Sequence, residues 1–399
     1  MRILFLHNNF PAQFGAFGQY LARAGWDVWF GTSREGVKAA GISVFQYKPH
    51  RDVTEKIHPY VANFESAIIN GQSAARACMA LAKKGLTPDI IMAHSGWGPG
   101  LFVKEIWPSA AYVSYFEWYY RPDSPDVLHF AKVPTDPDKS AKARARNAAI
   151  LMDLAHCDAG ICPTRFQKDQ FPDCFYSKLH ELHDGVDTQY YQPKKHAPRS
   201  IGDHVFSEAD EIITYVARGM EPYRGFPEIM RALEIVLAER PNAHAIIVGE
   251  DRVAYGAKLA EGDSHLKRAR ESLKLDWSRI HLTGLLPRPD YLRVLQMSDV
   301  HVYLTAPFVL SWSMLEAMSA GCAIIASDVE PVREVARKSS DAPLVLCAPD
   351  RAAENIIAVL KDRGLAARLG ERARALIADH YDSRNIYVQK AAWLESLVN

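Results

Sequence analysis

The feature that most constrains the fold is a regular alternation of short apolar runs with segments of helical length. The first series of apolar, β-branched or aromatic runs occupies residues 2–7, 27–32, 89–94, 111–117 and 159–164. A second series follows at residues 211–218, 244–250, 280–284, 300–305, 322–328 and 343–349. Continuous apolar runs separated by helices are typical of buried parallel strands in βαβ units. The sequence therefore predicts an α/β protein built on doubly wound parallel sheets.

The chain is expected to form two such domains, because 399 residues are many for a single core. Residues 187–210 are rich in proline, charge and turn residues and show little periodicity, as in a linker. We predict an N-terminal Rossmann-like domain over residues 1–195 and a C-terminal Rossmann-like domain over residues 205–380. The two domains are expected to face each other across a cleft.

Composition and simple motifs exclude several classes of protein. The 47 basic residues balance the 47 acidic residues, so no overall field favours a nucleic-acid partner. The six cysteines include no CxxC pair, which favours reduced thiols in a cytoplasmic protein over a disulfide framework or a zinc site. The first apolar run is too short for a signal peptide or a membrane span. Neither half contains GxGxxG or a Walker loop, which weakens dehydrogenase and NTPase interpretations.

Ligands of doubly wound sheets bind at the carboxyl ends of the strands, so the residues after each strand are the first candidates. After the first strand, Asn9, Phe10, Pro11 and Gln13 lead into a helix. The amides at the start of that helix would meet an anion. A polar connection without any ligand is the alternative.

Two further candidates follow later strands of the first half. His94 precedes the glycine-rich segment SGWGPG, which would allow a ligand to approach the backbone closely. A solvent-exposed histidine at a strand end is the alternative. Glu117 lies among four aromatic residues, so we expect its pKa to be raised and its carboxylate to accept a proton or bind a hydroxyl. An ion pair with Arg121 is the alternative for Glu117.

In the second half, two arginines follow the first strand, each beside a glycine. Arg218 and Arg224 are suited to a diphosphate, because each guanidinium offers paired donors. Simple surface exposure is the alternative. Gly249 and Glu250 close the next strand, where they would border a nucleoside.

Glu316 is the single carboxylate in the apolar, small-residue run from Pro307 to Ser327. Ser313 and Glu316 match the S-x-x-E capping box, so one interpretation is that Glu316 bonds the backbone of its own helix. The other is functional. The amides at the start of the helix would face a phosphate, and Glu316, one turn further on, would accept hydrogen bonds from a ribose diol.

Three ordered segments together resemble a known family. They are LHDGVDTQYYQP (182–193), ARGMEPYRGFPEIMRAL (217–233) and FVLSWSMLEAMSAGCAIIASD (308–328). They are similar to segments of retaining glycosyltransferases of the GT-B fold, glycosyltransferase family 4, and the resemblance covers nearly the whole chain. It implies two facing Rossmann-like domains with a deep inter-domain cleft, and a final helix, about 381–399, that packs back on the first domain.

The resemblance also implies a function. A nucleotide-sugar donor, a UDP-sugar in preference to a GDP-sugar, would bind to the second domain, and a glycan or lipid-linked acceptor would bind to the first. Attack on the donor from its front face would retain the anomeric configuration. No metal and no cofactor would be needed, because arginine charge and helix-end amides stabilise the leaving diphosphate.

The candidate residues drawn from the strand ends and from the resemblance together form three sets. The catalytic residues would be His94, Glu117, Arg218 and Arg224. The acceptor-side loop would contain Asn9, Phe10, Pro11 and Gln13. The donor would be bound by Arg218, Arg224, Gly249, Glu250, Leu285, Phe308, Val309, Leu310, Ser311 and Glu316.

One position departs from the family pattern. Phe308 stands where the first glutamate of the E-x7-E motif is expected, and that glutamate normally contacts the transferred sugar. The change predicts a different sugar, an anchor supplied by another residue, or loss of activity. Two alternatives to a glycosyltransferase therefore stay open: a non-catalytic nucleotide-sugar-binding or carbohydrate-binding protein, and a nucleotide-sugar epimerase that uses Glu117 and His94.

Residues 138–158 are basic at Lys139, Lys142, Arg144 and Arg146 and then apolar. Such a segment would touch an anionic lipid surface or a lipid-phosphate acceptor, or simply form a solvated helix face. The sequence thus predicts a cytoplasmic enzyme of polysaccharide, lipopolysaccharide or other glycan biosynthesis, with peripheral contact to the inner face of a membrane.

Overall fold

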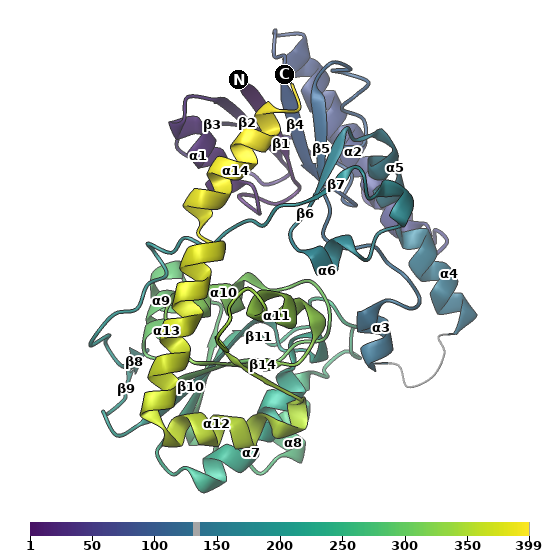
Figure 1. Ribbon diagram of the computed structural model, residues 1–399. Coiled ribbons are helices and arrows are strands. Elements are labelled where there is room, and N and C mark those ends of the chain that lie inside the picture. Colours follow the sequence, from purple (N-terminus) through teal and green to yellow (C-terminus); the bar gives the residue numbers. More distant parts are fainter. Residues whose placement is uncertain (131–135, 399) are drawn as a thin grey trace. The chain divides into compact units, whose positions relative to one another are not determined.

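The computed structural model describes residues 1–130 and 136–398, which form two compact units (Figure 1). Unit 1 comprises Met1–Asp184 and the C-terminal segment from Arg384, and unit 2 comprises Gly185–Ser383. The predicted first boundary, residue 195, lies inside unit 2. Unit 2 already begins at Gly185, because Val186 and Tyr191 pack in one of its buried clusters.

Unit 1 contains a seven-stranded sheet in the order β3-β2-β1-β4-β5-β6-β7, with every neighbouring pair parallel. Its strands are β1 (Arg2–Leu6), β2 (Asp27–Thr32), β3 (Ile42–Gln46), β4 (Ile90–His94), β5 (Ala111–Tyr115), β6 (Ala159–Cys162) and β7 (Leu179–Glu181). Its helices are α1 (Gly15–Arg23), α2 (Ala62–Ala82), α3 (Pro125–Phe130), α4 (Pro137–Arg146), α5 (Ala148–His156), α6 (Arg165–Lys168), the 3-10 turn η1 (Asp173–Phe175) and α14 (Ser383–Glu395), whose first residue belongs to unit 2.

Strand alternation distributes the core of unit 1 over both faces of the sheet. In β1, Leu4 and Leu6 share a buried cluster with residues of α2 and α5, whereas Ile3 and Phe5 share another with residues of α1 and α14. Helices therefore cover both faces, as expected for a doubly wound sheet. The final helix packs on unit 1 through buried Leu394, with Trp393 and Leu397 partly buried in the same cluster. Residue 399 of the predicted final helix lies outside the described residues.

Unit 2 contains a six-stranded parallel sheet in the order β12-β11-β10-β13-β14-β15 and a separate antiparallel hairpin, β8-β9. Its strands are β8 (Ser200–Ile201), β9 (His204–Val205), β10 (Glu211–Gly219), β11 (Ala243–Glu250), β12 (Ile280–Gly284), β13 (Val300–Tyr303), β14 (Ile324–Ser327) and β15 (Val345–Cys347). Its helices are η2 (Pro222–Arg224), α7 (Phe226–Glu239), α8 (His265–Ser272), η3 (Trp277–Arg279), α9 (Arg288–Gln296), α10 (Trp312–Ser319), α11 (Glu330–Ala336), η4 (Pro349–Arg351), α12 (Ala352–Lys361) and α13 (Arg363–His380).

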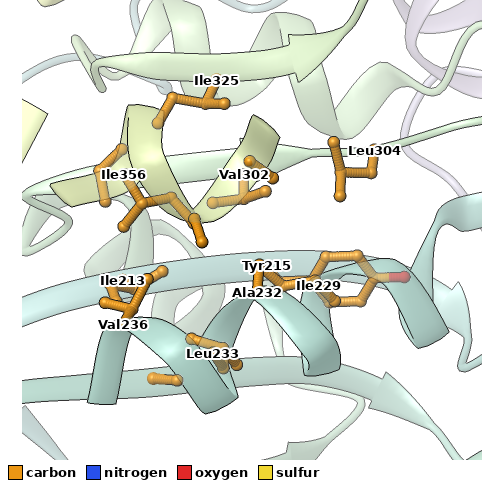
Figure 2. Packing of buried hydrophobic residues seen from close by; sticks show 14 of the residues in the cluster. Ile213, Tyr215, Ile229, Ala232, Leu233, Val236, Val302, Leu304, Ile325 and Ile356 are labelled. Atoms are coloured by element: carbon orange, nitrogen blue, oxygen red, sulfur yellow. The ribbon is translucent and has the colours of Figure 1, made fainter. Parts of the chain in front are cut away.

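The largest buried cluster of unit 2 joins α7 and α12 to the middle of the sheet (Figure 2). Ile229 and Val236, on the buried face of α7, lie in one cluster with Ile213 of β10 and Val302 of β13. A second cluster lies on the opposite face of the sheet. It joins α10, α11 and α13 to Tyr303 and other strand residues. The fold class predicted from the sequence, two Rossmann-like parallel-sheet domains, is thus confirmed.

Three strands or strand pairs were not predicted. β3 and β7 lie at the two edges of the unit 1 sheet, where short strands carry a weaker apolar signal than central ones. The β8-β9 hairpin lies within the predicted linker, because its four residues are mostly polar or exposed. All six cysteines are free, five of them buried and Cys174 exposed. Within the described residues, no helix combines the length and the apolar character that a membrane crossing requires.

Candidate active site

The first candidate site lies where the strand order of unit 1 reverses, between β1 and β4. Such switch points are where doubly wound sheets bind ligands. His7 directly follows β1, and His94 is the last residue of β4. Both histidines are buried, and their ring centroids lie 4.9 Å apart in an edge-to-face arrangement. The fold therefore brings two imidazoles together at the carboxyl edge of the sheet.

Glu117, shortly after β5, completes this group. Its Oε2 lies 3.4 Å from Nε2 of His94, and Gln13 donates from Nε2 to its Oε1 over 2.7 Å. The Glu117 side chain keeps 34% of its surface exposed, whereas that of His94 keeps 4%. The carboxylate is therefore fixed by protein contacts on one side and still open to a ligand hydroxyl on the other.

The charges of the three groups depend on one another. Burial by itself favours neutral His94 and neutral Glu117, but their mutual attraction and hydrogen bond prevail, so the pKa of His94 is raised and the pKa of Glu117 is lowered. Burial and the neighbouring His94 lower the pKa of His7 to about 3. The pairing thus favours the protonated form of His94 and the ionised form of Glu117, beside a neutral His7.

Contacts to the backbone fix how both histidines point. His94 Nδ1 lies 2.9 Å from the carbonyl oxygen of Ser95, to which it donates, so Nε2 is directed at Glu117. His7 Nδ1 accepts a hydrogen bond of 2.8 Å from the amide of Asn9. The other ring nitrogen of His7 then carries the proton of the neutral ring.

The second candidate site lies at the switch point of unit 2, between β10 and β13. Arg224, at the end of η2, contacts residues at and after the end of β13. Its Nη1 donates to the carbonyl oxygen of Val309 over 3.0 Å, with longer contacts of 3.3 and 3.4 Å to the hydroxyls of Thr305 and Tyr303. Gly225, with a φ of 67°, makes the turn possible, because a Cβ there would lie 2.3 Å from that of Leu304.

Arg224 is a buried cation without an acidic partner. Its exposed fraction is 6%, and none of the carboxylates in residues 1–130 and 136–398 forms an ion pair with it. A buried charge that lacks a counter-charge is costly, so the site favours an incoming anion. Within the same described residues, the amides of Val309 and Leu310 also have no protein acceptor. One guanidinium and two backbone amides thus remain as donors for an anion at the start of α10.

Other predicted donor-binding residues lie along the same carboxyl edge of the sheet. Arg218, near the end of β10, is exposed and forms no ion pair with any carboxylate that the structure describes. Glu250, at the end of β11, accepts a hydrogen bond of 2.6 Å from Arg252. Gly249 is buried beside it, and Leu285, directly after β12, is 58% exposed.

Glu316 lies in the second turn of α10 and is half-buried. Its Oε2 accepts a hydrogen bond of 2.8 Å from the hydroxyl of Tyr291. Burial raises the pKa of the Glu316 carboxyl, although Tyr291, Tyr191 and the charge of Arg288 oppose that rise. The N-cap of α10 is Ser311, whose hydroxyl accepts from the amide of Ser313. The capping-box interpretation is therefore wrong, because Glu316 bonds a tyrosine of α9 and not its own helix.

Two family models match the chain over most of its length. A model described as Glycosyl transferase family 4 group matches residues 24–191, and one described as Glycosyl transferases group 1 matches residues 198–376. The chain belongs to the glycosyltransferases of the GT-B fold. The family predicted from its three sequence segments is thus confirmed.

Solved structures show the same fold as this glycosyltransferase. Sucrose-phosphate synthase from Thermosynechococcus elongatus superposes with a TM-score of 0.73 at 16% identity, covering 100% of this chain and 99% of that one. HepE from Anabaena, in complex with UDP and glucose, gives 0.70 at 16% identity, covering 99% and 100%. Trehalose-6-phosphate synthase gives 0.66 at 12% identity, covering 99% of each chain. No curated protein matches the sequence significantly.

Two expectations about Glu117 are wrong. Its pKa is lowered and not raised, because the aromatic neighbours in sequence matter less than His94, which a separate strand brings within 3.4 Å. Arg121 is not its partner either, since Arg121 pairs with Asp123 at 3.3 Å. Both errors have one cause: the sequence does not show which residue of β4 will face the end of β5.

Phe308 of the glycosyltransferase is not open to a ligand. It is 8% exposed, and its ring centroid lies 5.3 Å from that of Tyr223 and 5.5 Å from that of Tyr255. Tyr255 in turn lies under the guanidinium of Arg224, 4.9 Å from ring centroid to Cζ. The Phe308 side chain is therefore packed against protein and is not available to contact the donor. An aromatic cluster occupies this position and supports Arg224.

The buried carboxylate of Glu221 holds the loop that carries Tyr255. Glu221 is fully buried and accepts hydrogen bonds of 2.9 to 3.2 Å from the amides of Ala254, Tyr255 and Gly256. This contact joins the loop after β11 to the turn that follows β10. The position of Tyr255 against Arg224 is therefore fixed by the backbone.

The glycine-rich loop after His94 serves internal packing. A Cβ at Gly98 would lie 1.9 Å from the carbonyl oxygen of Ala67 in α2, and one at Gly100 would lie 2.2 Å from the hydroxyl of Tyr112. These glycines let the loop pass close to its own domain. The predicted close approach of a ligand at these two positions is thus wrong, since protein atoms fill the space.

The loop after β1 divides into two parts. Gln13 lies in the site through Glu117, whereas Asn9 is exposed and accepts from the guanidinium of Arg34. Phe10 packs edge-to-face on Phe30, with centroids 4.9 Å apart, and Pro11 is exposed. Only Gln13 of the predicted acceptor-side residues is thus in contact with the His94–Glu117 pair.

Sequence reasoning missed His7, Tyr291 and Tyr255. His7 carried a signal in the sequence, because it follows the first strand directly. Residues at such strand ends are the ones that bind ligands in doubly wound sheets. Tyr291 and Tyr255 carried no such signal. They reach the site from α9 and from the loop after β11, and only the packing of these elements reveals them.

Proposed function

We propose that this glycosyltransferase moves a sugar from a nucleotide-sugar, a UDP-sugar in preference to a GDP-sugar, to a hydroxyl of a glycan or lipid-linked acceptor, with retention of the anomeric configuration. The observation that carries the proposal is Arg224, a buried guanidinium with no carboxylate partner among the described residues, beside the free amides of Val309 and Leu310. A diphosphate supplies the negative charge that this group of donors lacks.

The donor is proposed to bind on unit 2. Arg224 and Arg218 would contact the diphosphate, and the Glu316 carboxylate would accept hydrogen bonds from the ribose diol. HepE, which shares the fold, has been solved with UDP-glucose, which supports a uridine nucleotide. Gly249, Glu250 and Leu285 line the same edge of the sheet and would border the nucleoside.

The transfer itself exchanges one C–O bond for another. The acceptor oxygen bonds the anomeric carbon while the bond from that carbon to the diphosphate breaks. The acceptor proton passes to a phosphate oxygen on the same face, so the configuration is retained. Trehalose-6-phosphate synthase, which shares the fold, was solved in work on glycosyl transfer with retention. Guanidinium and amide donors aimed at the departing diphosphate are worth about 3 kcal/mol each in reactions of this kind.

The His94–Glu117 pair is proposed to bind sugar hydroxyls on unit 1. An ionised carboxylate that is partly exposed accepts strong hydrogen bonds, and protonated His94 keeps it ionised. The pair lies on unit 1, whereas the diphosphate donors lie on unit 2. Glu117 would be the acceptor for these hydroxyls, because it is the partly exposed carboxylate of the pair.

The test is an incubation of purified protein with UDP-, GDP-, ADP- and dTDP-sugars. We expect UDP-sugars to raise the melting temperature by mass action, and to be turned over with release of UDP when an acceptor sugar is added. The anomeric proton of the product, read by NMR, reports retention. Tight nucleotide binding without any product would instead favour a non-catalytic protein. Conversion of the donor into its epimer without UDP release would favour an epimerase.

Helix α4 is the proposed contact with an anionic membrane or lipid-phosphate acceptor. It carries Lys139, Lys142, Arg144 and Arg146, and none of its residues is buried. Arg146 is engaged, with Cζ lying 3.8 Å from the ring centroid of Tyr120. The remaining three cations face no core, so an anionic surface can attract them. This contact would bring a cytoplasmic enzyme to lipid-linked acceptors used in polysaccharide or lipopolysaccharide synthesis.

A further inference from the structure

Three histidines from three strands converge on unit 2, away from the candidate site of that unit. His204 belongs to β9, His244 to β11 and His281 to β12. One ring nitrogen from each can be chosen so that all lie within 4.8 Å of one another. The ring centroids are 4.5 to 5.4 Å apart. Three imidazoles gathered from separate segments form a cluster that their sequence spacing does not suggest.

Strand register explains how two of the rings meet. β11 and β12 are parallel, with Ile246 opposite His281. Side chains alternate along a strand, so His244, two residues before Ile246, lies on the same face as His281. The antiparallel β8-β9 hairpin brings His204 to this face, where the ring of Phe206 packs against all three histidines.

The distance between the rings of His244 and His281 suits a shared cation. Nδ1 of His244 lies 3.2 Å from Nε2 of His281. Two imidazole nitrogens bound to one tetrahedral zinc ion are about 3.4 Å apart, given zinc–nitrogen bonds of about 2.1 Å. A hydrogen bond between the two rings would also give this distance, but it would not account for the third histidine.

An acidic side chain lies behind the cluster. Oδ1 of Asp210 is 4.0 Å from Nε2 of His244, the nitrogen that points away from His281. Carboxylates in this position favour a proton on the outer nitrogen and leave the inner one free to bind a metal. Asp210 immediately precedes β10, so the support comes from the backbone of the sheet itself.

We propose that His204, His244 and His281 bind one divalent transition-metal ion, with zinc the best match to three imidazoles and a water. The site pins the β8-β9 hairpin to the sheet. His244 and His281 are the second residues of their strands. Glu250, at the other end of β11, lies about 20 Å further along the strand. The ion is therefore structural, and it is independent of the proposed glycosyl transfer.

The test uses the full chain without a polyhistidine tag. Metal is removed with a chelator, zinc is added, excess is removed by gel filtration, and bound zinc is measured by elemental analysis. We expect about one zinc per chain in the wild type. His204→Ala and His281→Gln should each lower the bound zinc at least tenfold. His380→Gln, at an exposed histidine of the same unit outside the cluster, should bind zinc like the wild type.

A second measurement separates metal loss from misfolding. Zinc should raise the melting temperature of the wild type and of His380→Gln but not that of His204→Ala, whose residue is exposed on the hairpin. Metal-free His204→Ala should melt like the metal-free wild type. A wild type that retains less than a tenth of an equivalent of zinc overturns the site. So does a His204→Ala,His281→Gln variant that retains a full equivalent.

Discussion

Nε2 of His94 lies 3.4 Å from Oε2 of Glu117, and this pair joins the ends of two neighbouring strands. The two residues are 23 positions apart in the chain and meet only because β4 and β5 are parallel neighbours. Their attraction outweighs the cost of burying both charges, so the pKa of the histidine rises and that of the carboxylate falls. The pair is therefore an ionised hydrogen-bonding group in a largely buried site.

Glu117→Gln should change the titration of His94. The wild-type imidazole is expected to titrate above the ordinary pKa of 6.5, and its pKa should be lower in the variant, where burial is opposed only by the contributions of Ser95 and Asp153. NMR of the imidazole resonances measures both values. Transfer should also fall about 100-fold, since a charged hydrogen-bond acceptor is lost. An unchanged His94 titration in Glu117→Gln would reject the coupling.

The same pair makes stability depend on pH in a defined direction. The stabilisation from His94, whose pKa is raised, is fully present below pH 6.5 and is lost as the pH rises through the folded-state value. That from Glu117, whose pKa is lowered, is present above pH 4.5 and is lost as the pH falls through its folded-state value. Comparing denaturant midpoints of the wild type and Glu117→Gln across pH measures both, and their difference should be largest between these limits.

Arg224→Ala should lower kcat by about 100-fold to 1,000-fold, because the departing diphosphate loses a charged donor. Arg224→Lys should fall between that variant and the wild type, since it keeps the charge and loses the paired donors. Steady-state assays of UDP release measure the effect. Arg231→Ala, at an exposed arginine of α7 paired with Glu228, is the matched control and should turn over normally. Full activity in Arg224→Ala would refute the assigned role.

Glu316→Gln should weaken nucleotide binding at least tenfold while leaving the melting temperature unchanged or higher. Burial raises the pKa of Glu316, so at neutral pH the ionised carboxylate costs folding stability, which the amide relieves. The hydroxyl of Tyr291 can still donate to the amide oxygen. Calorimetric titration with UDP and a thermal melt measure the two effects. A variant that binds UDP normally but melts lower would instead give Glu316 a structural role.

Phe308→Glu should destabilise the protein and not restore a sugar contact. The ring is 8% exposed and packs between Tyr223 and Tyr255, and a glutamate side chain cannot fill the space of the ring. Loss of this aromatic packing costs about 3 kcal/mol. Phe308→Leu is the milder control. A Phe308→Glu variant as stable as the wild type, with a new donor preference, would contradict the packing argument.

Lys139→Gln,Lys142→Gln should weaken binding to vesicles rich in anionic lipid. Each basic residue near such a surface contributes about 1 kcal/mol, so the double change should reduce binding roughly 30-fold at low salt. Cosedimentation with the vesicles measures it. The matched control is Lys83→Gln,Lys84→Gln, an exposed pair after α2 in the same unit. Wild type that does not sediment, or equal binding by both double variants, would remove α4 as a membrane contact.

The sequence by itself determined the fold class, the family and the strand ends at which the candidate sites lie. It could do so because buried parallel strands are continuous apolar runs, whose ends are visible in the chain. Arg224, His94 and Glu117 were found by this rule, whereas Glu316 was found as the single carboxylate of an apolar run. The N-cap of α10 and the pKa shift of Glu117 were not, since each depends on which neighbour a side chain meets.

Only the tertiary structure decided those neighbours. It placed His94 against Glu117, Tyr291 against Glu316, and an aromatic cluster around Phe308. It also gathered three histidines that lie 37 or more residues from one another into one cluster. The physical reason is that strand order and register set these distances, and both arise from packing of the whole sheet and not from any local stretch of sequence.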